Sequence, residues 1–373
     1  MDWVGEHLVY VSDPARLDAY RSAVARAVRD GFLVADLGCG TGVLGLMCLQ
    51  AGAARVYAID STPMVDVARR TFSNAGLLDR VTFTRAPSAR TDLPERVDLV
   101  ICDQVGYFGF DAGIVQCYAD ARRRFLKPGG MLIPARLRLY AAPVESPNSY
   151  RRVAAWDEDP VPSALRWVAE CAANTRHAVR FNPAELLGPP VRLGDIDLYA
   201  DDARLFSWKA SLPIERSGTL HGIAGWFECE LAPGVWMTNS PLAARPIQRP
   251  QALLPIREIA TVNAGECLAV SVMAKPRDEI LAWVVETASG GRFSQSTWHA
   301  APLTVDHVER ADPGRVPRKN REGMARLTVL GYCDGRRTAG EIEDLVLLEH
   351  PDLFPSPEES SRFVLDVLQK DAE

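Results

Sequence analysis

The stretch Val34-Ala-Asp-Leu-Gly-Cys-Gly-Thr-Gly42 joins an apolar strand directly to a glycine-rich turn. The residues after it, Val43 to Gly52, predict a helix, and Ala54 to Asp60 predict a second strand that ends on an acid. Strand, glycine turn, helix, strand and terminal acid together form a βαβ unit that binds a nucleotide cofactor. The glycines would let the backbone approach the ligand, and Asp60 would accept hydrogen bonds from both ribose hydroxyls.

The acid at the head of the turn indicates which cofactor the unit holds. A dinucleotide needs a third glycine at fixed spacing and a helix N-terminus aimed at its pyrophosphate. Here Asp36 would repel a pyrophosphate, whereas it suits the ammonium of an amino-acid moiety. The turn therefore predicts S-adenosylmethionine (SAM) in place of NAD. It contributes Asp36, Gly38, Cys39, Gly40, Thr41 and Gly42 to the predicted cofactor site.

Composition limits the class of protein. The 373 residues suggest two or three domains, and 47% hydrophobic with 24% charged residues is an ordinary globular balance. A net charge of −6 gives no overall attraction to nucleic acid or to an anionic membrane. We find no signal pattern and no apolar run of spanning length, so we expect a cytoplasmic protein. The eight cysteines are dispersed without a CxxC pair, which favours reduced thiols and predicts no metal site.

The pattern of predicted helices and strands changes along the chain. Alternating strands and helices predict an α/β, Rossmann-like, doubly wound parallel sheet over residues 1–135, with an N-terminal helix that starts at Pro14. Short strands between turn residues predict a β domain, sandwich or barrel, over 136–310, with a helical arm near 156–180. A basic linker then leads into a small helical module over 311–373, in which Thr338 and Glu341 form a capping box.

A loop follows the predicted buried strand Val97 to Cys102. It reads Asp103-Gln-Val-Gly-Tyr-Phe-Gly-Phe-Asp111 and lies at the carboxyl end of a central strand. In an open α/β sheet this position presents a reacting group.

With these residues in place, the chain resembles the protein arginine methyltransferases, class I SAM-dependent enzymes with a seven-strand fold, over about residues 2–300. His7 and Asp13-Pro-Ala-Arg16 resemble that family's N-terminal motif helix, which closes over the cofactor. The resemblance implies that Arg16 grips the methionine carboxylate of SAM and that the segment around Ser88 touches the adenine. It also implies a β-barrel whose inserted arm forms a head-to-tail homodimer. The residues added to the cofactor site are His7, Arg16, Asp60, Ser61, Ser88, Ala89 and Asp103.

The chain departs from this family where the acceptor would bind. Two glutamates clamp a guanidinium in the family; Asp103 replaces the first, and the second falls on Ala112, next to Asp111. Asp111 would supply the second charge or be a solvated loop acid. The family's Thr-His-Trp loop falls at Ile247 to Arg249, so Gln248 and Arg249 replace its histidine and tryptophan.

The four candidate catalytic residues are Asp103, Asp111, Gln248 and Arg249. Asp103 would orient an amine or take its proton. Arg249 would disfavour a cationic substrate and hold a carboxylate, or else it is a surface arginine beside Pro250.

The C-terminal module offers a second resemblance. Asp334-Gly-Arg-Arg-Thr338 followed by Glu341-Ile342 is similar to the small PqqD-like winged-helix family. That resemblance implies recognition of a leader peptide by strand addition. The alternative is a generic helical appendage.

The sequence therefore predicts a SAM-dependent methyltransferase that N-methylates a peptide, namely a natural-product precursor. Two alternatives stay open. One is methylation of a small amine, guanidine or carboxylate metabolite, and the other is a SAM-binding scaffold without catalysis.

Overall fold

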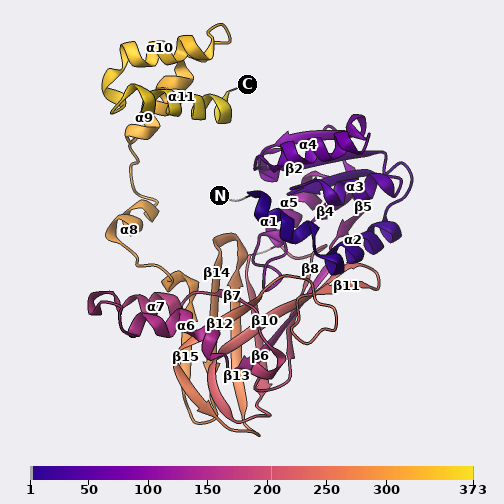
Figure 1. Cartoon of the computed structure of the whole chain (residues 1–373), viewed down its shortest axis with the longest axis vertical. Coiled ribbons are helices and arrows are strands. Elements are labelled where there is room, and N and C mark those ends of the chain that lie inside the picture. Colours follow the sequence, from indigo (N-terminus) through magenta and orange to yellow (C-terminus); the bar gives the residue numbers. More distant parts are fainter. Residues whose placement is uncertain (1–2, 203, 373) are drawn as a thin grey trace. The chain divides into compact units, whose positions relative to one another are not determined.

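The computed structural model describes residues 3–202 and 204–372 (Figure 1). The chain divides into two compact units, Met1–Pro302 and Leu303–Glu373. The first unit holds a parallel sheet and two antiparallel sheets, and the second is helical where it is described. Among the described residues, no helix combines the length and the apolar character that a membrane crossing requires.

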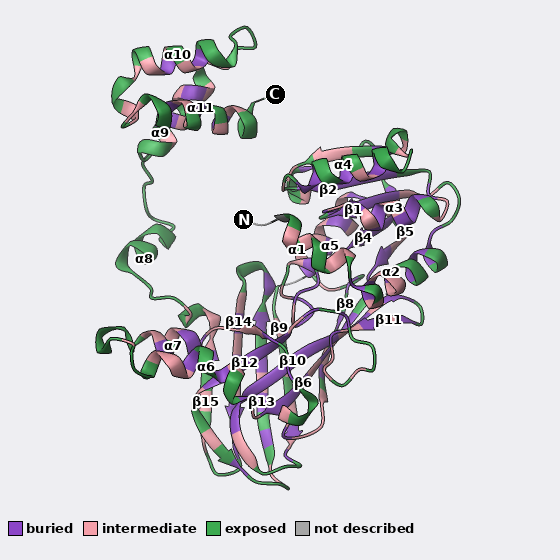
Figure 2. Cartoon of the chain, viewed as in Figure 1, coloured by how far each residue is buried: buried purple, intermediate pink, exposed green. Residues whose placement is uncertain are grey.

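Five parallel strands make up the first sheet, in the order β3-β2-β1-β4-β5. They are β1 (Leu33–Leu37), β2 (Arg55–Asp60), β3 (Val81–Arg85), β4 (Val97–Cys102) and β5 (Leu126–Ile133). The helices that accompany them are α1 (Trp3–Val11), α2 (Pro14–Ala27), α3 (Val43–Gln50), α4 (Met64–Asn74) and α5 (Ile114–Arg124). Strand β1 is central and almost wholly buried, as its continuous apolar sequence predicts (Figure 2). The predicted α/β parallel sheet is confirmed.

Helix α2 begins where the sequence predicts. The Asp13 side chain accepts a hydrogen bond from the Arg16 backbone N–H at 3.2 Å, and Pro14 occupies the first turn. Tyr20 and Val24 face the core of the unit. This orientation fixes the direction in which Arg16 leaves the helix.

The parallel sheet stops at five strands among the described residues, whereas the family resemblance implied seven. The next strand, β6 (Arg136–Val144), pairs antiparallel with β8 (Val191–Asp197) and β10 (Gly218–Ala232). Over Arg136 to Tyr140 its side chains alternate between buried and partly exposed. Such a strand suits a sheet with one covered face, whereas the inner strands β1, β2 and β4 of the parallel sheet are covered on both faces.

Two antiparallel sheets form the predicted β domain. One has the order β7-β12-β10-β6-β8, with β11 paired to β10, and the other has the order β15-β14-β13-β9. The remaining strands are β7 (His177–Val179), β9 (Phe206–Pro213), β11 (Val235–Thr238), β12 (Gln251–Val262), β13 (Cys267–Lys275), β14 (Ile280–Glu286) and β15 (Arg292–Ser296).

The arm differs from the single helix predicted over Trp156 to Val179. Two short helices, α6 (Pro147–Ala154) and α7 (Val168–Ala173), are joined by 3₁₀ turns. Pro160 and Pro162 break the helix because proline lacks a backbone N–H and restricts the residue before it. Tyr150, Val153, Ala172 and Ala173 form a small hydrophobic cluster between the two helices.

The second unit contains α8 (Val305–Ala311), α9 (Arg321–Gly331), α10 (Ala339–Glu349) and α11 (Pro357–Asp371). Its core consists of Val329, Ile342, Val346, Val364 and Val367. The predicted capping box of Thr338 and Glu341 is present at the start of α10. Residues 303–372 form no strand, so the wing of a winged helix is absent from this unit. Strand addition would require such a strand, and this part of the expectation is wrong.

Candidate functional site

The turn after β1 places its backbone against α1. Gly38, Gly40 and Gly42 have φ angles of 67°, 52° and 78°, a region that side chains rarely tolerate. A Cβ atom on Gly40 would lie 2.6 Å from the His7 Nε2 atom. The N–H groups of Gly38 and Cys39 donate to the Ile59 carbonyl at 2.8 and 3.1 Å, which fixes the turn on β2.

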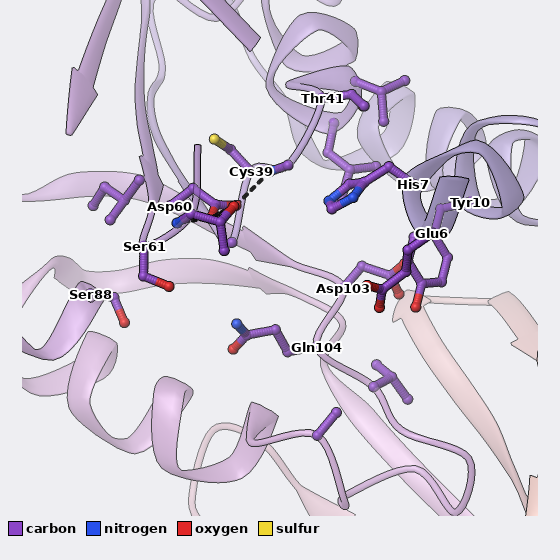
Figure 3. Close-up of a pocket in the computed structure, with 18 of the residues that line it drawn as sticks. Glu6, His7, Tyr10, Cys39, Thr41, Asp60, Ser61, Ser88, Asp103 and Gln104 are labelled. Carbon is purple, nitrogen blue, oxygen red and sulfur yellow. Dashed lines mark hydrogen bonds between the residues drawn. The ribbon is translucent and has the colours of Figure 1, made fainter. Parts of the chain in front are cut away.

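A cavity of about 420 Å³ lies over this turn (Figure 3). Predicted site residues that line it are His7, Arg16, Gly38, Cys39, Gly40, Thr41, Asp60, Ser61, Ser88, Asp103 and Arg249. Five further predicted residues, Asp36, Gly42, Ala89, Asp111 and Gln248, do not line it. The structure thus gathers most of the predicted set from three distant parts of the chain.

Asp60 is fixed at the wall of this cavity. One carboxylate oxygen accepts the Gly40 N–H at 2.8 Å, and the other accepts the Thr62 N–H and hydroxyl at 2.8 and 2.7 Å. Because these bonds leave little rotational freedom, the carboxylate is preorganised toward the cavity. A glycine cradle with an acid at the next strand end fits the nucleoside part of SAM.

Asp36 lies behind the turn. One of its oxygens accepts the Gly45 N–H at 2.9 Å, and the other is buried without a partner among the described residues. Burial raises the pKa of this carboxyl to about 7. Contact between Asp36 and the ammonium of a cofactor therefore stays a prediction.

Stability should depend on the titration of Asp36. Between about pH 4 and pH 7 the folded state keeps a proton that the unfolded state has lost, so stability falls as pH rises. Asp36→Asn removes this titration. Relative to the wild type, the variant should gain about 2–4 kcal/mol between pH 5 and pH 8 in urea unfolding. The exposed Asp66→Asn is the control, and a stability difference that does not change with pH would contradict the assignment.

Asp103 is the centre of a buried charge cluster. Its Oδ2 atom lies 2.6 Å from Arg16 Nε and 3.2 Å from Arg249 Nη2, and its Oδ1 accepts the Tyr20 hydroxyl at 2.9 Å. Arg16 and Arg249 are only 5% and 6% exposed. Burial by itself would raise the pKa of Asp103, but the two guanidinium groups hold that pKa below its usual value. The cluster therefore carries one net positive charge.

The cluster joins three segments. Arg16 comes from α2, Asp103 follows β4, and Arg249 lies just before β12. Asp13 ties the first segment to the third, because its Oδ2 accepts the Gln248 backbone N–H at 2.6 Å. The Gln248 side chain is exposed. The structure thus places Arg249 at the site and Gln248 outside it, and it contradicts the alternative that Arg249 is a surface residue.

Asp111 does not line the cavity that Asp103 lines. It forms an ion pair with Arg176, and it accepts the backbone N–H groups of Phe108 and Tyr107 at 2.8 and 3.3 Å. Its side chain is 8% exposed. Asp111 is therefore neither a second charge facing Asp103 nor a solvated acid, because the loop and Arg176 hold it.

Among the residues at the site that the sequence did not predict, two polar ones come from α1. Glu6 and Tyr10 line the cavity from α1, together with His7 (Figure 3). The Tyr10 ring centre lies 5.8 Å from the Arg16 guanidinium carbon and 5.4 Å from that of Arg249. Residues three or four positions apart share a helix face, and Tyr10 lies three positions from His7 and four from Glu6, so this spacing was the available signal.

Comparisons with known proteins agree with this architecture. Residues 34–130 match the model of a methyltransferase domain, and residues 135–282 match that of the arginine methyltransferase oligomerization subdomain. Protein arginine N-methyltransferase 6 of Xenopus laevis is 28% identical over 290 residues, which cover 74% of this chain and 85% of that protein. A probable protein arginine N-methyltransferase 6 of Arabidopsis thaliana is 29% identical over 241 residues, covering 61% of this chain and 55% of that protein.

Solved structures show the same fold. The Trypanosoma brucei PRMT1 enzyme-prozyme heterotetrameric complex with AdoHcy gives a TM-score of 0.71 at 19% identity, covering 79% of this chain and 99% of that chain. Arabidopsis thaliana protein arginine methyltransferase 10 gives a TM-score of 0.67 at 23% identity, and the match covers 79% of this chain and 98% of that chain.

Proposed function

We propose that this chain, a SAM-dependent methyltransferase built like the protein arginine methyltransferases, N-methylates a peptide amine that reacts without a positive charge. The observation that carries the proposal is the buried cluster of Arg16, Asp103 and Arg249. The named relatives are protein arginine N-methyltransferases, which supports a nitrogen acceptor on a peptide or protein.

The charges at the site do not suit a guanidinium. Clamping that planar cation requires paired carboxylates whose oxygens are free to accept its N–H groups. The Oδ2 atom of Asp103 already accepts from two arginines, and Asp111 is engaged by Arg176. The position of the family's second glutamate is Ala112. A guanidinium would therefore meet Arg249 beside Asp103 and would find alanine in place of the second acid.

SAM and the residues that would hold it have separate roles. When bound, SAM supplies an electrophilic methyl group. Asp60 would hold the ribose hydroxyls, Arg16 the methionine carboxylate, and the segment at Ser88 the adenine. These assignments rest on the positions of the three side chains around the cavity.

The positive cluster would act on the acceptor. A nearby cation disfavours the ammonium form of an amine and lowers its pKa, which frees the lone pair for attack. Arg249 is buried, so water screens its charge poorly. Asp103 would hold the two arginines in place through its ion pairs with them. It would not take the proton of the acceptor, because its lowered pKa makes it a weak base. The proton of the acceptor would therefore leave to solvent.

Two finer parts of the proposal concern assembly. We infer a homodimer through the arm of α6 and α7, which lies in the region matching the oligomerization subdomain. Recognition of a leader peptide by residues 303–373 would use helix faces, since the described part of this unit has no strand. Light scattering of the full chain tests the first.

A panel of matched peptides tests the acceptor. The purified chain is incubated with methyl-labelled SAM and acetylated pentapeptides that differ only in a central lysine, arginine or glutamine, together with a free N-terminal amine. We expect label on an amine and none on arginine. Label on arginine alone would overturn the proposed acceptor. Cofactor binding without label on any peptide would favour the scaffold.

A further inference from the structure

A second cavity, of about 440 Å³, adjoins the cofactor cavity, and Ala112 lines both. It is bounded by the end of the Asp103–Asp111 loop, the start of α5, and the turn between β13 and β14. We propose that this cavity is the subsite for the part of the acceptor next to the methylated nitrogen, and that it takes a basic peptide side chain. The proposal rests on the proposed peptide acceptor.

The loop connects the two cavities. Its first residues, Asp103 to Val105, line the cofactor cavity, and its last residues, Phe110 to Gly113, line the second. Strand β4 and helix α5 anchor its ends. A peptide whose amine enters the first cavity would therefore place a neighbouring side chain at the second.

Gln116 holds the turn that carries Glu279 at the second cavity. Gln116 Nε2 donates to the Pro276 carbonyl at 2.8 Å, which fixes the orientation of the amide. Gln116 Oε1 is consequently buried with no partner among the described residues. A ligand in the cavity does not reach this oxygen, so the contribution of Gln116 is to fix the turn that carries Glu279.

The charge of the cavity favours a cation on an apolar stem. Asp111 and Arg176 neutralise each other, which leaves the exposed Glu279 as the remaining charge in the lining. Glu279 has a φ of 55° at the turn before β14. Phe110 and Leu281 supply apolar wall. Such a site takes a basic side chain and rejects a carboxylate.

Two small probes test the subsite on the full chain without cofactor. They are Nα-acetyl-lysinamide and Nα-acetyl-norleucinamide, with affinities measured by saturation-transfer NMR. The lysine probe should bind more tightly to the wild type. Glu279→Gln should weaken its binding about two- to fivefold, because Glu279 is exposed to water. Asp278→Asn, a neighbouring acid outside the lining, should leave it unchanged.

A second variant guards against an indirect effect of Glu279. Gln116→Leu removes the hydrogen bond that fixes the turn carrying Glu279 and should also weaken binding of the lysine probe, with thermal unfolding as the check on folding. Equal affinity for both probes, or equal effects of Glu279→Gln and Asp278→Asn, would overturn the subsite. That result would leave the proposed function standing if the peptide panel showed amine methylation. If no amine in the peptide panel were methylated but the lysine probe still bound, only the proposed reaction would be contradicted.

Discussion

Replacing Asp103 with asparagine is expected to lower stability by about 3–5 kcal/mol and methyl transfer by about 100-fold. The substitution leaves Arg16 and Arg249 buried at 5% and 6% exposure without their counter-charge. Losing one partner of a buried ion pair is costly because the remaining charge cannot regain water. The two arginines would then move apart, and the site would lose the geometry that positions cofactor and acceptor.

Urea unfolding and methyl transfer to the labelled peptide measure the two effects. Asp18→Asn is the matched control, since Asp18 also pairs with two arginines, Arg21 and Arg245, but on the surface. We expect little change there. The pKa of Asp103 is lowered in the folded state, so its contribution is present above about pH 4 and lost as the pH falls through the folded-state value. Unchanged stability and activity in Asp103→Asn would contradict a central role for the cluster.

Replacing Arg249 with glutamine is expected to move the pH dependence of methyl transfer upward by about one unit. With the positive charge gone, the acceptor amine would keep its proton to higher pH. The rate near neutral pH should fall about tenfold and recover at alkaline pH. The measurement is kcat/KM against pH for the labelled peptide.

Two further variants separate charge from packing. Arg249→Lys keeps the charge and should keep the wild-type profile, although the flexible ammonium lacks the planar fork. Arg245→Gln lies in the same segment on the surface and should leave the profile unchanged. A fall in kcat/KM that is equal at every pH would show that Arg249 acts only by holding the loop. In that case the proposed effect on the amine would be wrong.

Local patterns in the sequence predicted the parallel sheet and the start of α2. Turn glycines need positive φ, a buried parallel strand needs continuous apolar residues, and Asp13-Pro14 supplies a helix cap with short-range bonds. Each of these requirements is met within a few residues, so it can be recognised from residues that are close together in the sequence. The arm was predicted less well, because Pro160 and Pro162 interrupt a segment whose residues otherwise favour a helix.

The acceptor site was beyond the reach of local pattern. Asp103 and Arg249 are 146 positions apart, and Asp111 and Arg176 pair across separate domain segments. The family resemblance predicted from the sequence that the guanidinium clamp has changed, but the sequence did not show which charge meets which. That depends on how the sheets pack.

By itself, the sequence predicted that the glycine turn, Asp60 and Arg16 belong to one site, because one contiguous βαβ unit and one helix carry them, and all three line one cavity. Only the tertiary structure decided which charged side chains meet around the proposed acceptor site. Folding brings Arg249 onto Asp103 and Arg176 onto Asp111. Burial then makes these pairs matter, because charges removed from water are poorly screened and must be balanced by their immediate neighbours.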